Sequence, residues 1–454
     1  MQVKRKFREH RMKRRLMAMN TQMMTTEVAI IGGGLAGLTA ANFAARAGMN
    51  VILFEKAHAV GGRAATETSN GFHFNLGPHA LYRRGAGVRI LGELGVEFSG
   101  AIASASGAYA IDRGVKHALP GGFVSLLTTG LMGLAAKMET ARLLAGIGNI
   151  DTQAIEHLSA REWLDREISQ PGTRQLVQAL FRVTTYANDP ERQSAGAVLR
   201  QAQMALAGGV YYLDGGWQTL VSGLRAAAEK SGVKIVTGAR VTEIERDQQK
   251  FLIHTADGTT FVAASVIIAA GPAEACALVK DGGNTVLNEW EQAAIPVKAA
   301  CLDLALEYLP QPRARFALGI DEPLYFSVHS ATAKLAPAGG ALIHAAKYLG
   351  PDASTDPKLV ERELEQTLDL VQPGWRKAVV ERRFLPKMTV TNALVTAAQG
   401  GLAGRPGPAV PGIDGLYVAG DWVGPEGQLA DASFASARLA VEMIAQGQHR
   451  AAAA

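Results

Sequence analysis

The sequence TEVAIIGGGLAGLTAANFAARAGMNVILFEKAHAVGGRA, residues 26–64, decides the fold of this chain. Val28 to Ile31 form a short apolar run, typical of a strand that is buried on both faces. Glycines then follow in the spacing G-x-G-x-x-G over residues 32–37, and small residues predict a helix over 38–47. A second apolar strand, 51–54, ends at Glu55. The order of strand, glycine turn, helix and strand predicts a βαβ unit of a parallel, doubly wound sheet.

Each glycine of this turn has a physical role in a dinucleotide site. Gly32 permits the tight turn, Gly34 lets the backbone approach a pyrophosphate, and Gly37 lets the helix pack close to the strand. The N–H groups at the helix start, with the positive end of its dipole, face that phosphate. The Glu55 carboxylate accepts hydrogen bonds from ribose hydroxyls and would repel a 2′-phosphate, which argues against NADP. Glycine turns also occur for packing alone, but the complete unit favours the dinucleotide site.

Composition indicates an ordinary globular protein. The 454 residues are 48% hydrophobic and 19% charged, enough for two or three domains and a large core. The net charge of +5 comes from residues 1–20, which hold eight basic residues and one acidic residue, so the rest of the chain carries −2. This basic run lacks both aromatic interleaving and a following apolar h-region. We expect residues 1–23 to be a disordered tail, with no role in nucleic-acid binding.

The remaining compositional features concern the compartment. Cys276 and Cys301 show neither metal spacing nor disulfide density, so we expect buried thiols, no metal, and a reducing, cytoplasmic location. No uninterrupted apolar run reaches membrane-spanning length. The apolar segment 123–144 is interrupted by charges, and it leaves open a peripheral contact with a membrane.

Three further motifs return to the same predicted site. Gly61-Gly62-Arg63 follows the second strand, where the glycines let the backbone pass close to a ligand and Arg63 offers a cation to a diphosphate. Residues 72–79 alternate like a strand and end in Gly77-Pro78-His79. Near the C-terminus, a strand over 415–419 leads into Gly420-Asp421, and a helix is expected over 430–445. Asp421 can bind a polyol hydroxyl, and the helix start can face a negatively polarised ring edge.

Two insertions interrupt the nucleotide-binding pattern. Residues 106–205 open with a hairpin and continue as amphipathic helices, one of them started by the capping box Ser159-Ala160-Arg161-Glu162. Residues 291–400 contain strands and one helix, 357–371. We therefore predict a dinucleotide-binding domain made of 24–105, 206–290 and 401–448, and a discontinuous α+β substrate-binding domain made of 106–205 and 291–400.

With these motifs, the chain resembles the FAD-dependent superfamily of amine oxidases, protoporphyrinogen oxidases and phytoene desaturases. The resemblance implies a Rossmann-like FAD domain and an FAD that is bound non-covalently, because residues 420–438 contain no cysteine for a covalent link. The cofactor contacts that it implies are Gly32, Gly34, Leu35, Ala36, Gly37, Glu55, Lys56, Gly62, Arg63, Gly77, Pro78, Val241, Gly271, Gly420, Asp421, Leu429 and Ala430.

The same resemblance implies an oxidoreductase that transfers a hydride from a C–H bond to flavin N5. Apolar helical insertions favour a largely apolar small-molecule substrate, as in the desaturases, over an amine; oxygen or a quinone would accept the electrons. Lys298 matches the strand lysine of the amine oxidases, and His79 could face the ligand, so both are candidate catalytic residues. An amine oxidase and a non-catalytic, FAD-binding assembly protein remain alternatives. Trp422 is the one candidate for an aromatic wall near the C-terminal motif.

Overall fold

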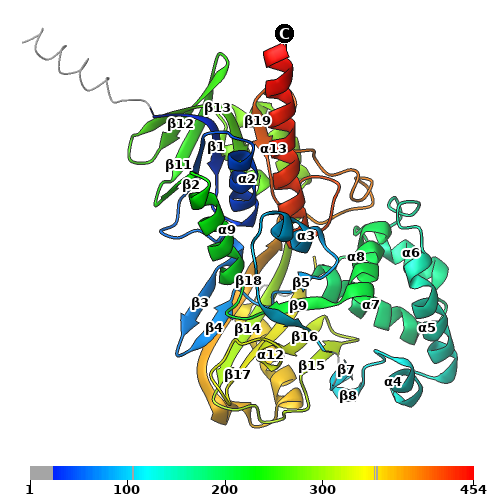
Figure 1. Cartoon of the computed structure of the whole chain (residues 1–454). Helices are drawn as coiled ribbons and strands as arrows, with labels where there is room; N and C mark the ends of the chain where they lie inside the picture. The colour runs from blue at the N-terminus through cyan, green and yellow to red at the C-terminus, as the bar shows by residue number, and fades with distance from the viewer. Residues whose placement is uncertain (1–23, 105–106, 352, 354–355, 454) are drawn as a thin grey trace, which may run out of the picture.

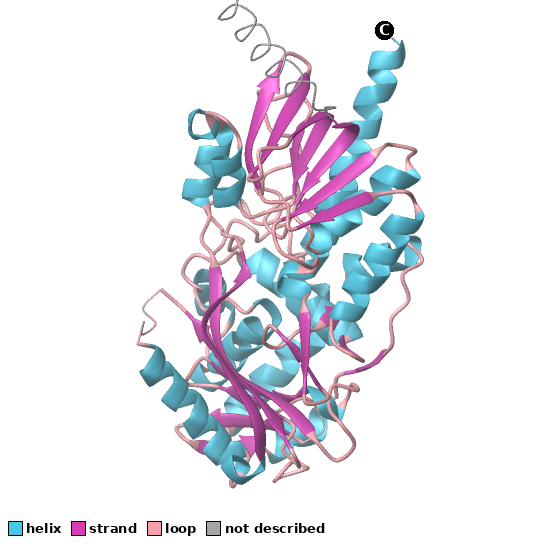
Figure 2. Cartoon of the chain, turned by 90° about the vertical axis from the view of Figure 1, so that its left-hand side faces the viewer, coloured by secondary structure: helices cyan, strands magenta, loops and turns pink. Residues whose placement is uncertain are grey.

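The computed structural model describes residues 24–104, 107–351, 353 and 356–453, so the predicted tail 1–23 lies outside the described residues. Two large sheets lie one above the other along the long axis of the molecule (Figure 2). A group of helices stands to one side of the lower sheet (Figure 1). The chain crosses between the upper and lower parts several times, as the interrupted sequence pattern predicts.

The upper sheet has seven strands in the order β10-β2-β1-β13-β12-β11, with β19 paired to β13. The core of the sheet is parallel, and β11 and β12 pair antiparallel at one side. Its strands are β1 (Met24–Ile31), β2 (Val51–Glu55), β10 (Lys234–Thr237), β11 (Val241–Asp247), β12 (Lys250–Thr255), β13 (Thr260–Ile268) and β19 (Leu416–Val418).

Helices cover both faces of this sheet. Val28 and Ile30 of β1 pack under α2 (Leu35–Arg46), α3 (Ala86–Glu93), α9 (Gln218–Lys230) and α13 (Leu429–Ala453). Ala29 and Ile31 point to the opposite face, toward α10 (Pro272–Leu278) and α11 (Val286–Ala293). The apolar run of β1 therefore serves two cores, as expected for a parallel strand buried on both faces. This confirms the predicted Rossmann-like α/β class.

The lower sheet also has seven strands, in the order β18-β14-β17-β16-β15-β7-β8. Helix α12 (Pro357–Val371) packs on one face through Val360, Leu364 and Leu368. The strands are β7 (Ala108–Asp112), β8 (Val115–Ala118), β14 (Val297–Leu306), β15 (Phe316–Gly319), β16 (Leu324–Val328), β17 (Ala341–Leu349) and β18 (Val379–Thr391). The hairpin β7–β8 lies in the same sheet as strands about two hundred residues later in the chain, because β7 pairs in parallel with β15.

The helical group beside this sheet consists of α4 (Phe123–Thr128), α5 (Leu134–Gly146), α6 (Ala160–Glu167), α7 (Pro171–Thr185) and α8 (Ala195–Gly208). The predicted capping box is present: the Glu162 amide donates to Ser159 Oγ over 3.1 Å, and the Ser159 amide donates to Glu162 Oε2 over 2.8 Å. Among the described residues, none of the helices is both long enough and apolar enough to cross a bilayer.

Two small sheets join the upper and lower parts. One pairs β3 (Thr66–Ser69) with β4 (Phe72–Asn75), and the other has the order β5 (Leu81–Tyr82), β9 (Val210–Leu213), β6 (Gly100–Ile102). Strand β9 follows the helical group directly, so the chain re-enters the upper part through this sheet. The sequence did not predict this three-stranded sheet, because its strands are short and their partners are distant.

Candidate cofactor-binding and active site

The glycine turn after β1 is packed as the sequence predicts. A Cβ atom on Gly37 would lie 1.8 Å from the carbonyl oxygen of Gly32, so helix and strand approach too closely for any side chain at position 37. Gly32 has φ +109°, and a Cβ there would lie 2.6 Å from the Ala269 carbonyl oxygen. Only glycine satisfies both positions. The turn is therefore held tightly between β1, β13 and α2.

Gly34 differs from these two glycines, and this difference tests whether a pyrophosphate fits. A Cβ on Gly34 would meet nothing closer than the Gly61 carbonyl oxygen at 4.0 Å. Gly34 is the N-cap of α2 and has no side chain that could accept a hydrogen bond from the first turn. The N–H groups of Leu35, Ala36 and Gly37 lie in this first turn, where an N–H group has no partner within the helix. An anion fits this helix start.

Glu55 lies at the end of β2, beside the turn. Its Oε2 accepts the Gly33 amide over 2.7 Å, and its Oε1 accepts the Ala57 amide over 2.8 Å. Each carboxylate oxygen keeps a lone pair for a hydroxyl group. The side chain is therefore oriented by backbone donors, and its position matches the predicted ribose contact. Lys56, the next residue, is exposed.

A second glycine loop crosses the first. Gly61 and Gly62 have φ of +135° and +53°, and Gly61 forms a bridge with Gly34. Arg63 follows, and its Nη1 donates to Asp421 Oδ2 over 2.6 Å and to the Val390 carbonyl oxygen over 2.8 Å. The guanidinium is 45% exposed whereas Asp421 is 2% exposed. Two residues 358 positions apart, each predicted separately for the cofactor site, thus form one ion pair.

Asp421 is held by partners that the sequence did not predict. Asn392 donates to its carboxylate through Nδ2 over 2.9 Å, and the Asn392 amide lies 3.2 Å from Oδ2. The Asn392 side chain also lies beside Gly271, where a Cβ would be 2.8 Å from its Oδ1. Arg405 donates to the Asp421 carbonyl oxygen over 3.1 Å, and burial lowers the pKa of Arg405 to about 10. Asn392 in a loop and the partly buried Arg405 belong to no motif, so the sequence gives no signal for either residue.

A cavity adjoins this group. It lies between the upper sheet, β14, β18 and the helical group, and Asp421 and Arg405 form its polar side. Leu429, the first residue of α13, also lines it and has φ +54°, a conformation that non-glycine residues rarely adopt. The apolar and uncharged part of the lining comprises Thr185, Ala187, Gln193, Val297, Thr391, Ala393, Leu394, Val395 and Gln428. Half of the lining residues are therefore polar, and the cavity volume of about 10 Å³ is the space of a single water molecule.

His79 lies in the loop that passes beneath the second glycine turn. Its Nε2 is 3.0 Å from the Arg63 carbonyl oxygen, and its Nδ1 is 3.1 Å from the Gly77 carbonyl oxygen. Burial lowers the pKa of His79, although both carbonyl contacts oppose this shift. The ring packs edge-on against Trp217 at 5.0 Å. The imidazole therefore connects its own loop to the Arg63 loop, and whether it also acts on a substrate stays a prediction.

The same loop contacts the helical group. Gly77 has φ +76° and packs on Met388, while the Pro78 carbonyl oxygen accepts a hydrogen bond from Tyr186 over 3.0 Å. Burial raises the pKa of Tyr186 well above its usual value, so this phenol is neutral. Tyr186 thus joins the end of α7 to the predicted cofactor loop.

Lys298 is the second residue of β14 and lies between Leu349 of β17 and Thr389 of β18. Its neighbour Val297 lines the cavity. Successive side chains of a strand point to opposite faces, so Lys298 is directed away from the face that Val297 presents. The catalytic role of Lys298 stays a prediction that this geometry does not favour.

Trp422 is not an aromatic wall of the cavity. The ring is 2% exposed, its indole N–H donates to the Ala270 carbonyl oxygen over 2.9 Å, and it packs edge-on against Trp290. It belongs to the core beneath the upper sheet. Three other predicted cofactor contacts belong to elements of the upper part. Gly420 exchanges hydrogen bonds with Ser436. Val241 is buried at the start of β11, and Ala430 lies in the first turn of α13.

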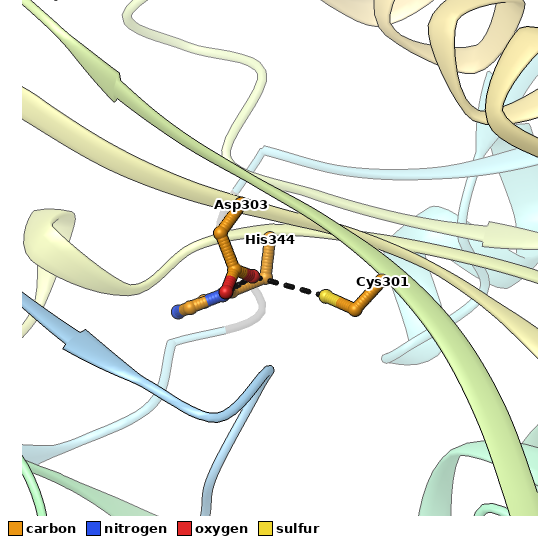
Figure 3. Close-up of side chains that lie close together, drawn as sticks. All are labelled: Cys301, Asp303 and His344. Carbon is orange, nitrogen blue, oxygen red and sulfur yellow. Dashed lines mark hydrogen bonds and ion pairs between the residues drawn. The ribbon is translucent and has the colours of Figure 1, made fainter. Parts of the chain in front are cut away.

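A buried polar group lies under this site in the lower sheet. Asp303 accepts hydrogen bonds from His344 Nδ1 over 2.6 Å and from Cys301 Sγ over 3.0 Å (Figure 3). Arg383 also donates to it over 2.6 Å. Asp303 and His344 are wholly buried. Burial alone would raise the pKa of Asp303, but His344 and Arg383 outweigh it and lower that pKa. Arg383 also donates to the Asn75 carbonyl oxygen, which connects this group to the loop that leads to His79.

This group has the donor types of a metal site but not its charge balance. The thiol, carboxylate and imidazole ligand atoms lie within 4.8 Å of one another. The Arg383 guanidinium, however, already neutralises the carboxylate, and burial together with the Asp303 charge raises the pKa of Cys301 well above its usual value. A protonated thiol is a poor metal ligand. We therefore read this group as the polar interior of the sheet.

Comparison with known proteins agrees with this architecture. Residues 35–297 match the family model described as flavin containing amine oxidoreductase. A carotenoid 3,4-desaturase of Haloarcula japonica is 27% identical over 289 residues, which are 55% of this chain and 56% of the relative. A 4,4′-diaponeurosporene oxygenase of Staphylococcus aureus is 24% identical over 286 residues, 54% of this chain and 55% of the relative. This chain thus aligns with about half the length of the curated relatives it matches.

Among solved structures, an oxidoreductase from Methanosarcina mazei superimposes with a TM-score of 0.72. It is 21% identical, and the match covers 93% of this chain and all of the other. This likeness shows the fold. The family model covers more than half of the chain and includes the α2 start, Glu55 and Arg63, and its cofactor class is a flavin. The chain belongs to the family of flavin containing amine oxidoreductases.

Proposed function

We propose that this protein is an FAD-dependent oxidoreductase that oxidises a C–H bond of a largely apolar small molecule. The observation that carries the proposal is the start of α2, where the N-cap Gly34 has no side chain, beside the Glu55 carboxylate. This pairing suits a dinucleotide, and the relatives named for a carotenoid and for diaponeurosporene support an apolar substrate.

We propose that the following residues would hold FAD. The amides of Leu35, Ala36 and Gly37 would bind the pyrophosphate, with Arg63 as the neighbouring cation. Glu55 would accept the adenosine ribose hydroxyls, and Asp421 would bind the ribityl region. Since no cysteine lies in residues 420–438, a covalent link to that segment is excluded, and we propose a dissociable FAD.

When bound, FAD would supply the hydride acceptor, its N5 atom. The chain's own contribution is binding, orientation and exclusion of water. Val297, Leu394 and Leu429 offer an apolar wall, and the Tyr186 and His79 contacts hold the loop between the upper and lower parts. Oxygen or a quinone would receive the electrons.

A polyene is the first substrate class to test. The two curated relatives are named for a carotenoid and for diaponeurosporene. The competing class is an amine, which the family description allows. Lys298, the residue that would favour an amine oxidase, is on the strand face opposite to that of Val297.

The test is an anaerobic titration of the purified, flavin-loaded protein with polyenes, amines and porphyrinogens. We expect the flavin absorbance to bleach with a polyene and to stay unchanged with simple amines. Rapid bleaching by amines alone would replace the desaturase proposal with an amine oxidase. If no class bleaches the flavin and its removal abolishes partner binding, the protein is a non-catalytic assembly factor.

The two candidate catalytic residues can be separated in the same assay. A residue that transfers a proton in the rate-limiting step contributes about 10² to 10⁴ in rate. Lys298→Met and His79→Phe should leave flavin reduction within about tenfold of the wild type if these side chains only support the structure. A larger loss at unchanged flavin content would assign a catalytic role to the residue concerned.

A further inference from the structure

Helices α4 and α5 carry the densest group of exposed apolar side chains in the described part of the chain. Phe123 and Leu134 are 74% and 73% exposed, although such residues are normally buried. The Lys137 ammonium donates to the Leu127 carbonyl oxygen over 2.7 Å and so joins the two helices. We call this surface the α4–α5 patch; its members are Phe123, Val124, Leu127, Leu134 and Met138, with Val115 of β8 close by in sequence.

The charge of this segment is opposite in sign to that of the remaining body. Residues 112–149 hold four basic residues, Arg113, Lys116, Lys137 and Arg142, and two acidic residues, Asp112 and Glu139; Asp112 Oδ2 lies 3.9 Å from Arg113 Nε. The Glu139 carboxylate accepts hydrogen bonds from Ser169 and Gln170, so it is directed to the start of α7. The chain from residue 24 onward carries −2 overall, so this segment is basic within an acidic body. An apolar surface with a basic surround complements an anionic lipid surface.

An apolar connection leads from this patch into the molecule. Leu119 and Leu131, which precede and follow α4, pack in the same cluster as Leu176 and Val183 of α7. That cluster continues to Val297, Leu394 and Leu429, which line the cavity beside Asp421. The segments that flank α4 therefore belong to the apolar core that reaches the candidate active site. Figure 1 places α4 and α5 at the outer rim of the helical group, away from the upper sheet.

We propose that the α4–α5 patch docks on an anionic lipid bilayer, with Phe123 and Leu134 inserted at the level of the acyl chains. A second copy of this chain fits the surface less well. In a two-fold contact the patch would face itself, and Arg113, Lys116 and Arg142 would then approach their own copies. Docking deepens the proposed function and rests on it, because an apolar substrate would be dissolved in the lipid. The docking itself is tested without any substrate.

The test uses the full-length chain with Phe123→Trp and vesicles that contain phosphatidylglycerol with brominated acyl chains. Four of the five native tryptophans, at 163, 217, 375 and 422, are at most 4% exposed, so an added tryptophan reports on its own surroundings. We expect the fluorescence at position 123 to shift to the blue and to be quenched by the brominated lipid. Leu206→Trp is the matched control, because Leu206 is an exposed apolar residue of a helix, 51% exposed, that lies outside the patch. Its fluorescence should not change.

Binding strength provides the second measurement. Phe123→Ser and Leu134→Ser should each weaken vesicle binding about tenfold, and Leu206→Ser should not. High salt screens the charges of the basic residues 1–20. If apolar insertion is the cause of vesicle binding, the serine variants should therefore still bind more weakly than the wild type at high salt. The proposal is overturned if position 123 is quenched no more than position 206. It is also overturned if the protein dimerises without vesicles and Phe123→Ser abolishes the dimer. Neither result bears on flavin reduction, so the proposed function stands or falls separately.

Discussion

The two halves of this molecule use polar residues in opposite ways. In the upper part, Glu55 and Asp421 lie at strand ends and bind backbone amides or the half-exposed Arg63. In the lower part, Asp303 and His344 lie inside the sheet with no exposed surface at all. The upper set lies beside a glycine turn and the half-exposed Arg63, whereas the lower set is enclosed by the sheet. We therefore expect Glu55 and Asp421 to serve binding, and Asp303 and His344 to serve the fold.

The largest expected effect tests the lower half. Asp303→Asn removes the charged partner of the wholly buried His344 and of the partly exposed Arg383, and we expect a loss of about 3 to 5 kcal/mol in the free energy of unfolding. Urea unfolding measures it. Glu361→Gln is the matched control, because Glu361 pairs with the neighbouring Arg382 near the surface and should cost less than about 1 kcal/mol. Equal losses in the two variants would remove the contrast between the halves.

A second substitution tests the packing of the upper half. Gly37→Ala places a methyl group 1.8 Å from the Gly32 carbonyl oxygen, so α2 must move away from β1. We expect a loss of about 3 kcal/mol in stability together with loss of flavin from the purified protein. Gly92→Ala in α3, where a Cβ meets nothing within 4 Å, should be neutral or stabilising. A Gly37→Ala protein that keeps its flavin and its stability would contradict the tight packing assigned here.

A third measurement concerns pH. Asp431 in α13 accepts the Gly87 amide over 2.7 Å, and burial raises its pKa to about 7. The folded protein therefore holds a proton on this carboxyl that the unfolded chain releases above about pH 4. The resulting stability is complete below pH 4 and is lost as the pH rises through about 7.

Asp431→Asn should remove this decline, which amounts to about 1.4 kcal/mol per pH unit at its steepest. Thermal unfolding of both proteins at pH 5 and pH 7 measures the difference. Glu442→Gln, on the same helix but at its surface, should leave the pH dependence unchanged. His329 in the lower half acts with opposite sign, because burial lowers its pKa and protonation below about pH 6.5 then costs stability. An unchanged slope in Asp431→Asn would show that this carboxyl is already ionised.

The smallest effect on stability is expected at Arg63. Its pair with Asp421 is half exposed on the arginine side, so Arg63→Met should change the free energy of unfolding by less than about 1 kcal/mol. Flavin affinity, measured by equilibrium dialysis, should nevertheless fall because a cation beside the phosphates is lost. A stability loss as large as that of Asp303→Asn would show that the upper half also depends on its polar residues for folding.

The upper half could be predicted from sequence because its signals are local. Gly32, Gly34, Gly37 and Glu55 lie within one βαβ unit, where strand, turn and helix follow one another directly. Glycine spacing there reports backbone contacts within a few residues. The predicted helix 357–371 and the capping box at Ser159 were confirmed for the same reason.

The lower half was harder to predict from the sequence, because its polar contacts join distant parts of the chain. Arg383 reaches Asp303 across 80 residues and Asn75 across 308 residues. No spacing rule connects such residues, since the sheet brings them together only through its strand order. Trp422 illustrates the same limit: its place beside Asp421 suggested the cavity, but its contacts with Ala270 and Trp290 place it in the core.

The strand order of the upper sheet also has a consequence for synthesis on the ribosome. Strand β1 pairs with β2 at once, but its other neighbour is β13, where Val28 lies opposite Ser265. At translation rates of 5–20 residues per second, β1 waits roughly 10 to 50 seconds for that partner. During this time one edge of a strand whose second half, 28–31, is entirely apolar is unpaired. Until more than half of the protein has been made, this edge therefore needs protection from association with nascent chains on neighbouring ribosomes of the same mRNA.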